Sequence, residues 1–175
     1  MKSQAQILGA LVLIAGAAFA RLVPHPAIVT PIIAMALFAG ATLSRKPWAL
    51  AVPLLAMFVS DLGLGIHEQM ASVYGSIVLV SLIGLAVQKN KKPVVLAGAS
   101  VASSLLFFAL TNLTVWFQSG MYPRTGAGLA QCYIAALPFL RNGLLGDLAF
   151  TGVLFGAYAL YTRAVEARLA ASESI

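Results

Sequence analysis

Polar and ionisable side chains are scarce in this chain, and most of them stand near the ends of long apolar stretches. Ionisable residues inside apolar segments of membrane length are costly, and by default they mark an interior functional site. Such residues predict a concave ligand site with aromatic and apolar walls and a few polar groups. No catalytic residue is predicted. The candidate ligand-binding residues are Arg21, His25, Asp61, His67, Asn112, Trp116, Tyr122, Arg124, Cys132, Arg141, Asn142 and Asp147.

A structural role is the alternative for several of these residues. Arg141 and Asp147 are six positions apart, so on one helix they do not share a face, and a direct pair needs a break near Asn142. Without a break, each needs another partner. Asp61 falls in the last turn of an expected helix, where the helix dipole prefers cations, which makes a merely structural role less favoured. His25 stands between two prolines and is either a turn residue or a ligand.

The aromatic and sulfur-containing candidates leave alternatives open as well. Trp116 and Tyr122 are either membrane-interface aromatics or a stacking surface for a planar ligand. Cys132 is the single cysteine, so it forms no internal disulfide and is either an apolar filler or a thiol ligand. His67 and Glu68 are adjacent, unlike the His pair one helical turn apart in helical zinc sites, so no metal site is predicted.

Enzyme motifs are absent from the sequence. It contains no Gly-x-Ser-x-Gly, no phosphate loop and no paired Cys-x-x-Cys. Gly63-x-Gly65 lacks the third glycine of a dinucleotide-binding loop. We therefore expect no enzymatic activity, no bound cofactor and no hydrolysis of ATP by this chain alone.

The composition is that of a membrane protein. Hydrophobic residues make up 61% of the 175 residues, charged residues only 9%, and the mean hydropathy is +0.94. Soluble domains carry about 25% charged residues, so this chain cannot cover a water-facing surface. The net charge of +6 comes without a basic stripe or stacking aromatics, which argues against nucleic acid as a partner.

Apolar stretches predict a single all-α domain, a bundle of six transmembrane helices over residues 5–22, 29–43, 48–64, 73–87, 93–117 and 143–162. The apolar stretch 129–139 is too short to span a bilayer. It predicts a re-entrant or interfacial segment before the last helix, or an extended start of that helix. The first stretch also has the features of a secretory signal peptide, and we expect it to be retained as a helix.

The positive charges indicate an orientation for this bundle. With the N-terminus in the cytoplasm, the outer side holds only Arg21, Arg124 and Arg141. Cytoplasmic loops carry the excess of Lys and Arg, so both termini are predicted to be cytoplasmic. The cytoplasmic residues are Lys2, Arg45, Lys46, Lys89, Lys91, Lys92, Arg163 and Arg168.

Several short segments in a fixed order carry a family resemblance. They include Arg21-Leu-Val-Pro-His-Pro, Ser60-Asp61-Leu, Thr111-Asn112-Leu-Thr-Val-Trp, Gln131-Cys132-Tyr and Gly146-Asp147-Leu. This combination, over about residues 20–156, resembles an uncharacterised family of small bacterial membrane proteins regarded as transport proteins. The broader architecture resembles the S component, the substrate-binding subunit, of energy-coupling-factor vitamin transporters.

The resemblance implies a function and a partner. S components are six-helix proteins with cytoplasmic termini that bind vitamins, or in some groups metal ions, near the outer face. They dock through small residues of the first helix onto a transmembrane coupling protein driven by two ATPases. The implied function is the substrate-binding subunit of a vitamin-type importer in the bacterial inner membrane, which captures its ligand in a pocket on the outer face. Cobalamin is one candidate ligand, with Cys132, His25 or His67 as its axial ligand.

The small residues of the expected helices are compatible with such docking, although the first helix has no strict Ala-x-x-x-Ala repeat. The pairs with one-turn spacing are Ala5 with Gly9, Gly16 with Ala20, and Ala36 with Gly40. Small residues let helix backbones approach closely in lipid, either within this protein or against a partner. The alternative function is a non-transport accessory or structural subunit of a larger membrane complex.

Overall fold

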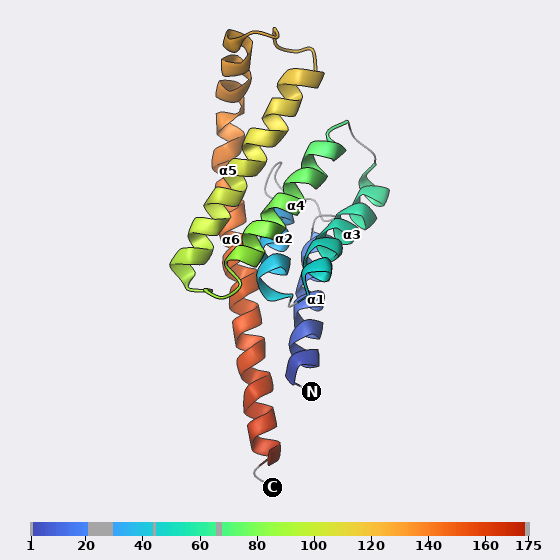
Figure 1. Cartoon of the computed structure of the whole chain (residues 1–175), viewed down its shortest axis with the longest axis vertical. Coiled ribbons are helices and arrows are strands. Elements are labelled where there is room, and N and C mark those ends of the chain that lie inside the picture. Colours follow the sequence, from blue (N-terminus) through green and yellow to red (C-terminus); the bar gives the residue numbers. More distant parts are fainter. Residues whose placement is uncertain (1, 21–29, 44, 66–67, 174–175) are drawn as a thin grey trace.

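The structure, a computed structural model, describes residues 2–20, 30–43, 45–65 and 68–173. Within these residues it contains six helices and no strand, as the sequence predicts (Figure 1). The helices are α1 (Lys2–Ala20), α2 (Ile32–Thr42), α3 (Lys46–Leu64), α4 (Met70–Ala86), α5 (Pro93–Gln118) and α6 (Gly126–Glu173). The predicted ends of the first five lie within a few residues of these bounds.

Helix α2 forms the centre of the bundle. Each of its residues from Ile32 to Ala41 is buried, and α2 packs against all five other helices. Its Phe38 ring meets Phe155 and Tyr158 of α6 edge-on, with ring centroids 5.1 and 5.4 Å apart. With 11 residues, α2 is about 16 Å long, which is about half of a bilayer's hydrocarbon thickness. It is thus a core element enclosed by longer helices.

Two glycines allow α2 and α4 to touch backbone to backbone. A Cβ atom on Gly84 of α4 would lie 2.9 Å from the Gly40 Cα of α2 and would collide with the Leu37 carbonyl oxygen. A Cβ atom on Gly40 would collide in the same way with the Ser81 carbonyl oxygen. Only glycine therefore fits on either side of this crossing, and the crossing fixes α2 in the middle of the bundle.

The other small-residue pairs have different surroundings. Gly9 of α1 lies against the ring of Tyr161, whose hydroxyl donates to the Ala5 carbonyl oxygen at 3.0 Å. The helix surface formed by Ala5 and Gly9 is therefore in contact with α6 of the same chain. Gly16, by contrast, is exposed and has open space where a Cβ atom would stand.

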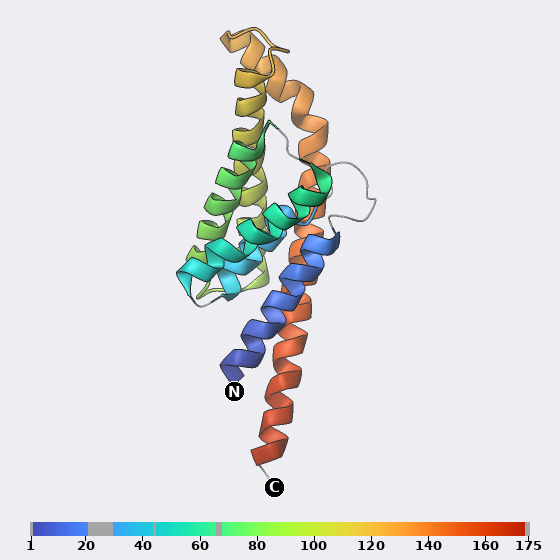
Figure 2. The same cartoon turned by 90° about the vertical axis from the view of Figure 1, so that its right-hand side faces the viewer.

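Of the two predictions for residues 129–139, the extended start of the last helix is confirmed, and the re-entrant or interfacial segment is wrong. These residues belong to α6, which runs unbroken for 48 residues from Gly126 rather than from 143, about 72 Å. The segment stays helical because it packs on α5. Cys132 and Ala136 are buried, and the Tyr133 hydroxyl donates to the Ala109 carbonyl oxygen at 2.6 Å. Pro138 lies inside α6, and the orange part of α6 is inclined to its red part in Figure 2, as an internal proline permits.

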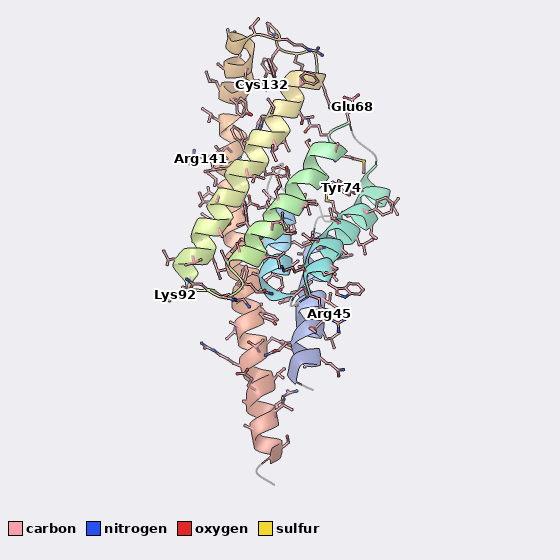
Figure 3. All side chains as sticks on the ribbon, in the orientation of Figure 1. Arg45, Glu68, Tyr74, Lys92, Cys132 and Arg141 are labelled. Carbon is pink, nitrogen blue, oxygen red and sulfur yellow. The ribbon has the colours of Figure 1, made fainter. Side chains whose placement is uncertain are left out.

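Helices α5 and α6 form a hairpin that projects beyond the other helices, and both chain ends lie at the opposite end of the molecule (Figures 1 and 2). These two helices are long and apolar enough to cross a membrane. Arg45 and Lys92 lie toward the end with the termini, whereas Glu68 and Cys132 lie toward the hairpin end (Figure 3). Arg45 of the α2–α3 connection and Lys92 of the α4–α5 connection thus share the half of the molecule that contains the termini.

A cavity beside Asp147 as the candidate functional site

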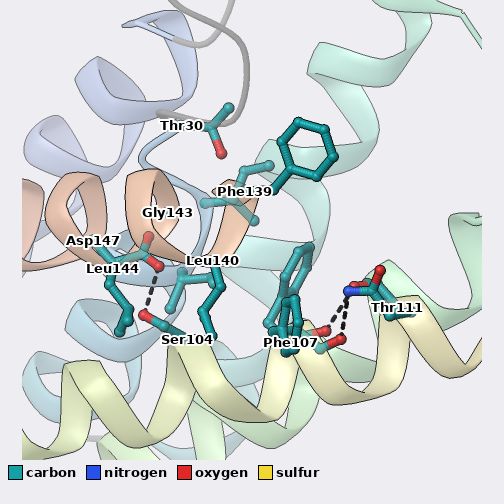
Figure 4. Close-up of a pocket in the computed structure, with 13 residues that line it drawn as sticks. Thr30, Ser104, Phe107, Thr111, Phe139, Leu140, Gly143, Leu144 and Asp147 are labelled. Carbon is teal, nitrogen blue, oxygen red and sulfur yellow. Dashed lines mark hydrogen bonds between the residues drawn. The ribbon is translucent and has the colours of Figure 1, made fainter. Parts of the chain in front are cut away.

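A cavity of about 130 Å³ lies between the start of α2 and the facing sides of α5 and α6 (Figure 4). The residues of α5 that line the cavity recur at intervals of three or four positions, and so do those of α6. Each helix therefore lines the cavity with one face. Seven of the lining residues are apolar or aromatic, and the polar ones are concentrated on α5 with a single carboxylate on α6. The lining residues are Thr30, Ile32, Ile33, Ser104, Phe107, Phe108, Thr111, Asn112, Phe139, Leu140, Gly143, Leu144 and Asp147.

Asp147 is the charged residue of this cavity. Its side chain is 4% exposed, and its Oδ2 atom accepts a hydrogen bond from the Ser104 hydroxyl at 2.6 Å, drawn as a dashed line in Figure 4. The Ser104 hydroxyl also lies 3.0 Å from the Ser100 carbonyl oxygen. A hydroxyl has one hydrogen and can donate to only one of these acceptors at a time. Donation to Asp147 at this short distance has the geometry of a charge-assisted bond to an ionised carboxylate.

A second polar contact joins α5 and α6 one turn further along both helices. The Thr151 hydroxyl of α6 donates to the Ser100 hydroxyl oxygen of α5 at 3.1 Å, and both residues are buried. Hydroxyl hydrogen bonds between helices add modest stability in an apolar environment. Together the two contacts hold α5 and α6 in one register, which places Asp147 at the cavity.

The other polar groups on α5 offer mainly acceptor oxygens. The Thr111 hydroxyl donates to the Phe107 carbonyl oxygen at 2.8 Å, and the Asn112 amide donates to the Phe108 carbonyl oxygen at 2.8 Å. The hydrogen of the Thr111 hydroxyl is thereby used, while its oxygen lone pairs are still able to accept. The cavity therefore combines one carboxylate with further oxygen acceptors in apolar walls.

Two more of the predicted site residues are buried close to helix contacts, in different places. The Cys132 thiol of α6 lies 3.5 Å from the Asn112 carbonyl oxygen of α5, just beyond the cavity. Asp61 is 2% exposed at the end of α3, and its Oδ2 accepts from the Tyr74 hydroxyl of α4 at 2.8 Å. Asp61 is not among the residues that line the cavity.

The predicted aromatic and basic candidates near the α5–α6 connection fasten this connection to the end of α5. The Trp116 indole N–H donates to the Pro123 carbonyl oxygen at 2.9 Å. The Arg124 guanidinium donates to the Phe117 carbonyl oxygen at 3.1 Å and lies 4.9 Å from the centre of the Phe117 ring. Tyr122 is half-buried in the same loop. These contacts stabilise the turn, and none of these residues lines the cavity.

Arg141 and Asn142 are exposed on α6. Because α6 has no break between Arg141 and Asp147, which are six positions apart, their side chains lie on different faces of the helix. Arg21, His25 and His67 lie outside the residues that the structure describes. Of the predicted site residues, the structure thus brings Asn112 and Asp147 to the same cavity and sets Cys132 next to Asn112.

A protein-family model matches residues 1–169, a range that includes every residue of the cavity. The chain belongs to the DUF6580 family. That family is described as one of unknown function. Neither the curated proteins nor the solved structures contain a match to this DUF6580 chain.

Sequence reasoning missed several residues that build the cavity of this DUF6580 protein. Ser104, Phe107 and Phe139 read as ordinary members of apolar stretches, since serine and phenylalanine are common in such helices. A weak signal exists for Ser104, because it stands one turn after Ser100 and one turn before Phe108 on a face that continues to Asn112. The partner of that face, Asp147, is 43 positions away from Ser104, so no local pattern connects the two.

Proposed function

We propose that this protein is the ligand-capturing subunit of a small-molecule importer of the vitamin type, embedded in the bacterial inner membrane by a bundle of six helices. One observation carries the proposal. The buried carboxylate of Asp147 lines a cavity on α6, a helix that is long and apolar enough to cross a membrane. An ionisable group at such a place is expensive, and its usual purpose is to contact a substrate or ion.

The apolar surface supports embedding of the other helices as well. Phe19 of α1 is 67% exposed and Leu62 of α3 is 69% exposed, and each has exposed apolar neighbours on its helix. A water-soluble monomer rarely shows apolar surface of this extent. Lipid is the natural cover for α1, α3 and α4, and α2 is shielded inside them. The basic residues near the termini are consistent with a cytoplasmic location for that end.

The volume of the cavity limits the size of the ligand. Pockets for drug-sized ligands have volumes of about 300–1,000 Å³, and this cavity measures about 130 Å³. It is large enough for a compact molecule of a few non-hydrogen atoms, since one water takes about 30 Å³ in the liquid. The cavity as it stands favours a ligand far smaller than cobalamin.

Import against a gradient requires an energy source, and the sequence has no motif for nucleotide hydrolysis. We propose a transmembrane coupling protein with ATPases as the partner. Its docking place on α1 would be the open side around Gly16, because the side around Gly9 is occupied by Tyr161.

Co-purification tests the capture function. The protein is purified in mild detergent, extracted, and its bound small molecules are identified by mass spectrometry. Asp147→Asn keeps the shape of the side chain and removes its charge, and Glu166→Gln makes the same change at an exposed position of the same helix. We expect a bound compound in the wild type and in Glu166→Gln, and its loss in Asp147→Asn. An empty wild-type protein that is found in a stable complex with another membrane protein would instead support the accessory-subunit function.

Cysteine labelling tests the proposed topology. In a Cys132→Ser background, single cysteines replace Asn90, between α4 and α5, or Ser119, at the end of α5, and both positions are exposed. We expect a membrane-impermeant maleimide to label the Ser119→Cys protein in intact cells and the Asn90→Cys protein only after permeabilisation. Equal labelling of both in intact cells would contradict the proposed orientation.

A further inference from the structure

We infer that the cavity beside Asp147 selects a small organic cation, an ammonium compound with a compact apolar body. This inference rests on the proposed capture function and names the chemical class of its ligand. Three features of the described cavity lead to it: the sign of the charge in the lining, the nature of the walls, and the hydrogen-bonding groups that face the space.

The charge in the lining is negative. Among the thirteen lining residues of the cavity, Asp147 is ionisable with a carboxylate, and none is lysine, arginine or histidine. A carboxylate taken out of water is stable only when a cation, a proton or hydrogen bonds compensate its charge. A ligand cation next to Asp147 provides this compensation, whereas an anionic ligand would add a second uncompensated charge.

The aromatic walls suit a cation with an apolar body. Phe107, Phe108 and Phe139 line the cavity, and the face of an aromatic ring attracts an organic cation. The Phe108 ring is held in place by Tyr133 of α6, with ring centroids 5.6 Å apart and an angle of 68° between the rings. Such a cation therefore meets apolar surface that also favours its charge.

The polar groups of the cavity match a donor ligand. Thr111 uses its hydroxyl hydrogen on a backbone carbonyl, so its oxygen is left to accept. The Ser104 hydroxyl is able to turn its hydrogen toward Asp147 or toward the Ser100 carbonyl oxygen. An ammonium group that pairs with Asp147 favours the ionised carboxylate, and Ser104 then donates to it. An N–H donor thus finds acceptors here, while an acceptor ligand finds few donors.

Three probes with the same tert-butyl body test the inference: tert-butylammonium, tert-butanol and pivalate, which are positive, neutral and negative near neutral pH. Dissociation constants are measured by ligand-observed NMR on the full-length protein in detergent micelles. We expect the wild type to bind tert-butylammonium most tightly. Asp147→Asn should weaken this binding by about tenfold or more and leave tert-butanol unchanged, because only the cation loses a charged partner.

Two further variants separate the charge effect from loss of folding. Glu166→Gln, at an exposed position of α6, should bind all three probes as the wild type does. Phe139 is 53% exposed, and Phe139→Leu should weaken tert-butylammonium binding by about threefold with little effect on tert-butanol. This result would support the cation site even if Asp147→Asn fails to fold.

Two results overturn the inference. One is tighter binding of tert-butanol or pivalate than of tert-butylammonium by the wild type. The other is unchanged tert-butylammonium binding by a folded Asp147→Asn protein. In both cases a compound that co-purifies with the wild type would still support capture of a ligand, but one of neutral or anionic class. The absence of any co-purifying compound would contradict the capture function itself.

Discussion

Replacement of Gly84 by alanine adds only a methyl group, yet it is expected to destabilise the bundle. In Gly84→Ala, the new Cβ would lie 2.9 Å from the Gly40 Cα and 3.0 Å from the Ala41 backbone nitrogen. It would also collide with the Leu37 carbonyl oxygen. All three atoms belong to the backbone of α2, so no side chain can turn away, and α2 and α4 have to separate.

Two opposing terms give the magnitude. Overpacking of a close contact costs about 1–3 kcal/mol, and rigid backbone on the facing side favours the upper part of this range. Replacement of glycine by alanine inside a helix returns about 1 kcal/mol. The net loss in the free energy of unfolding is therefore about 1–2 kcal/mol for Gly84→Ala. For a protein of this size it corresponds to a melting temperature about 2–8 °C lower.

Gly75 provides the matched control, since it lies on the same helix, is exposed, and has open space where a Cβ atom would stand. Gly75→Ala makes the same chemical change and should raise stability by up to about 1 kcal/mol. Thermal unfolding of both variants in the same detergent, followed by tryptophan fluorescence, measures the difference. A Gly84→Ala protein as stable as Gly75→Ala would refute the backbone-to-backbone crossing of α2 and α4.

Three other properties can be predicted from the structure. Tyr74→Phe removes the hydroxyl that donates to buried Asp61 and should lower the free energy of unfolding by about 1–3 kcal/mol. A loss in the Tyr74→Phe, Asp61→Asn double variant that is smaller than the sum of the two single losses would confirm the coupling. Cys132 is 2% exposed, so a maleimide should react with the folded protein far more slowly than with the denatured protein, and equal rates would disprove this packing. Ile14 of α1 is 1% exposed, and Ile14→Ala should cost about 2 kcal/mol or more in thermal unfolding, unless α1 is removed from the mature protein, which its intact mass would reveal.

The sequence alone was enough to predict the all-helical class of the described residues and the approximate bounds of the first five helices. These properties depend on local composition: long apolar runs, few charges, and Pro and Gly at the boundaries. Pro47 and Pro93 stand in the first turns of α3 and α5, where a missing backbone N–H costs nothing, and Gly65 follows α3 with a positive φ of 101°. The presence of polar and ionisable residues in apolar segments also pointed to Asn112 and Asp147.

Other features depended on tertiary contacts. The helices are apolar on all sides, so no periodicity in the sequence distinguishes the enclosed α2 from the helices around it. The apolar stretch 129–139 was too short to span a bilayer, which left open a separate segment or an extended start of the last helix. Packing against α5 makes it part of one continuous α6. Trp116 and Arg124 resembled ligand contacts because they are polar in an apolar context, and the structure shows that they close a loop.

The cavity itself was decided by the way in which α5 and α6 pack on each other. Ser104 meets Asp147 across 43 positions of sequence, and their meeting requires the antiparallel register that the contact between Ser100 and Thr151 also holds. Sequence chemistry could identify a costly carboxylate, because the cost is a property of one residue in an apolar segment. Its neighbours, and therefore the sign, size and shape of the space beside it, are properties of the packed helices.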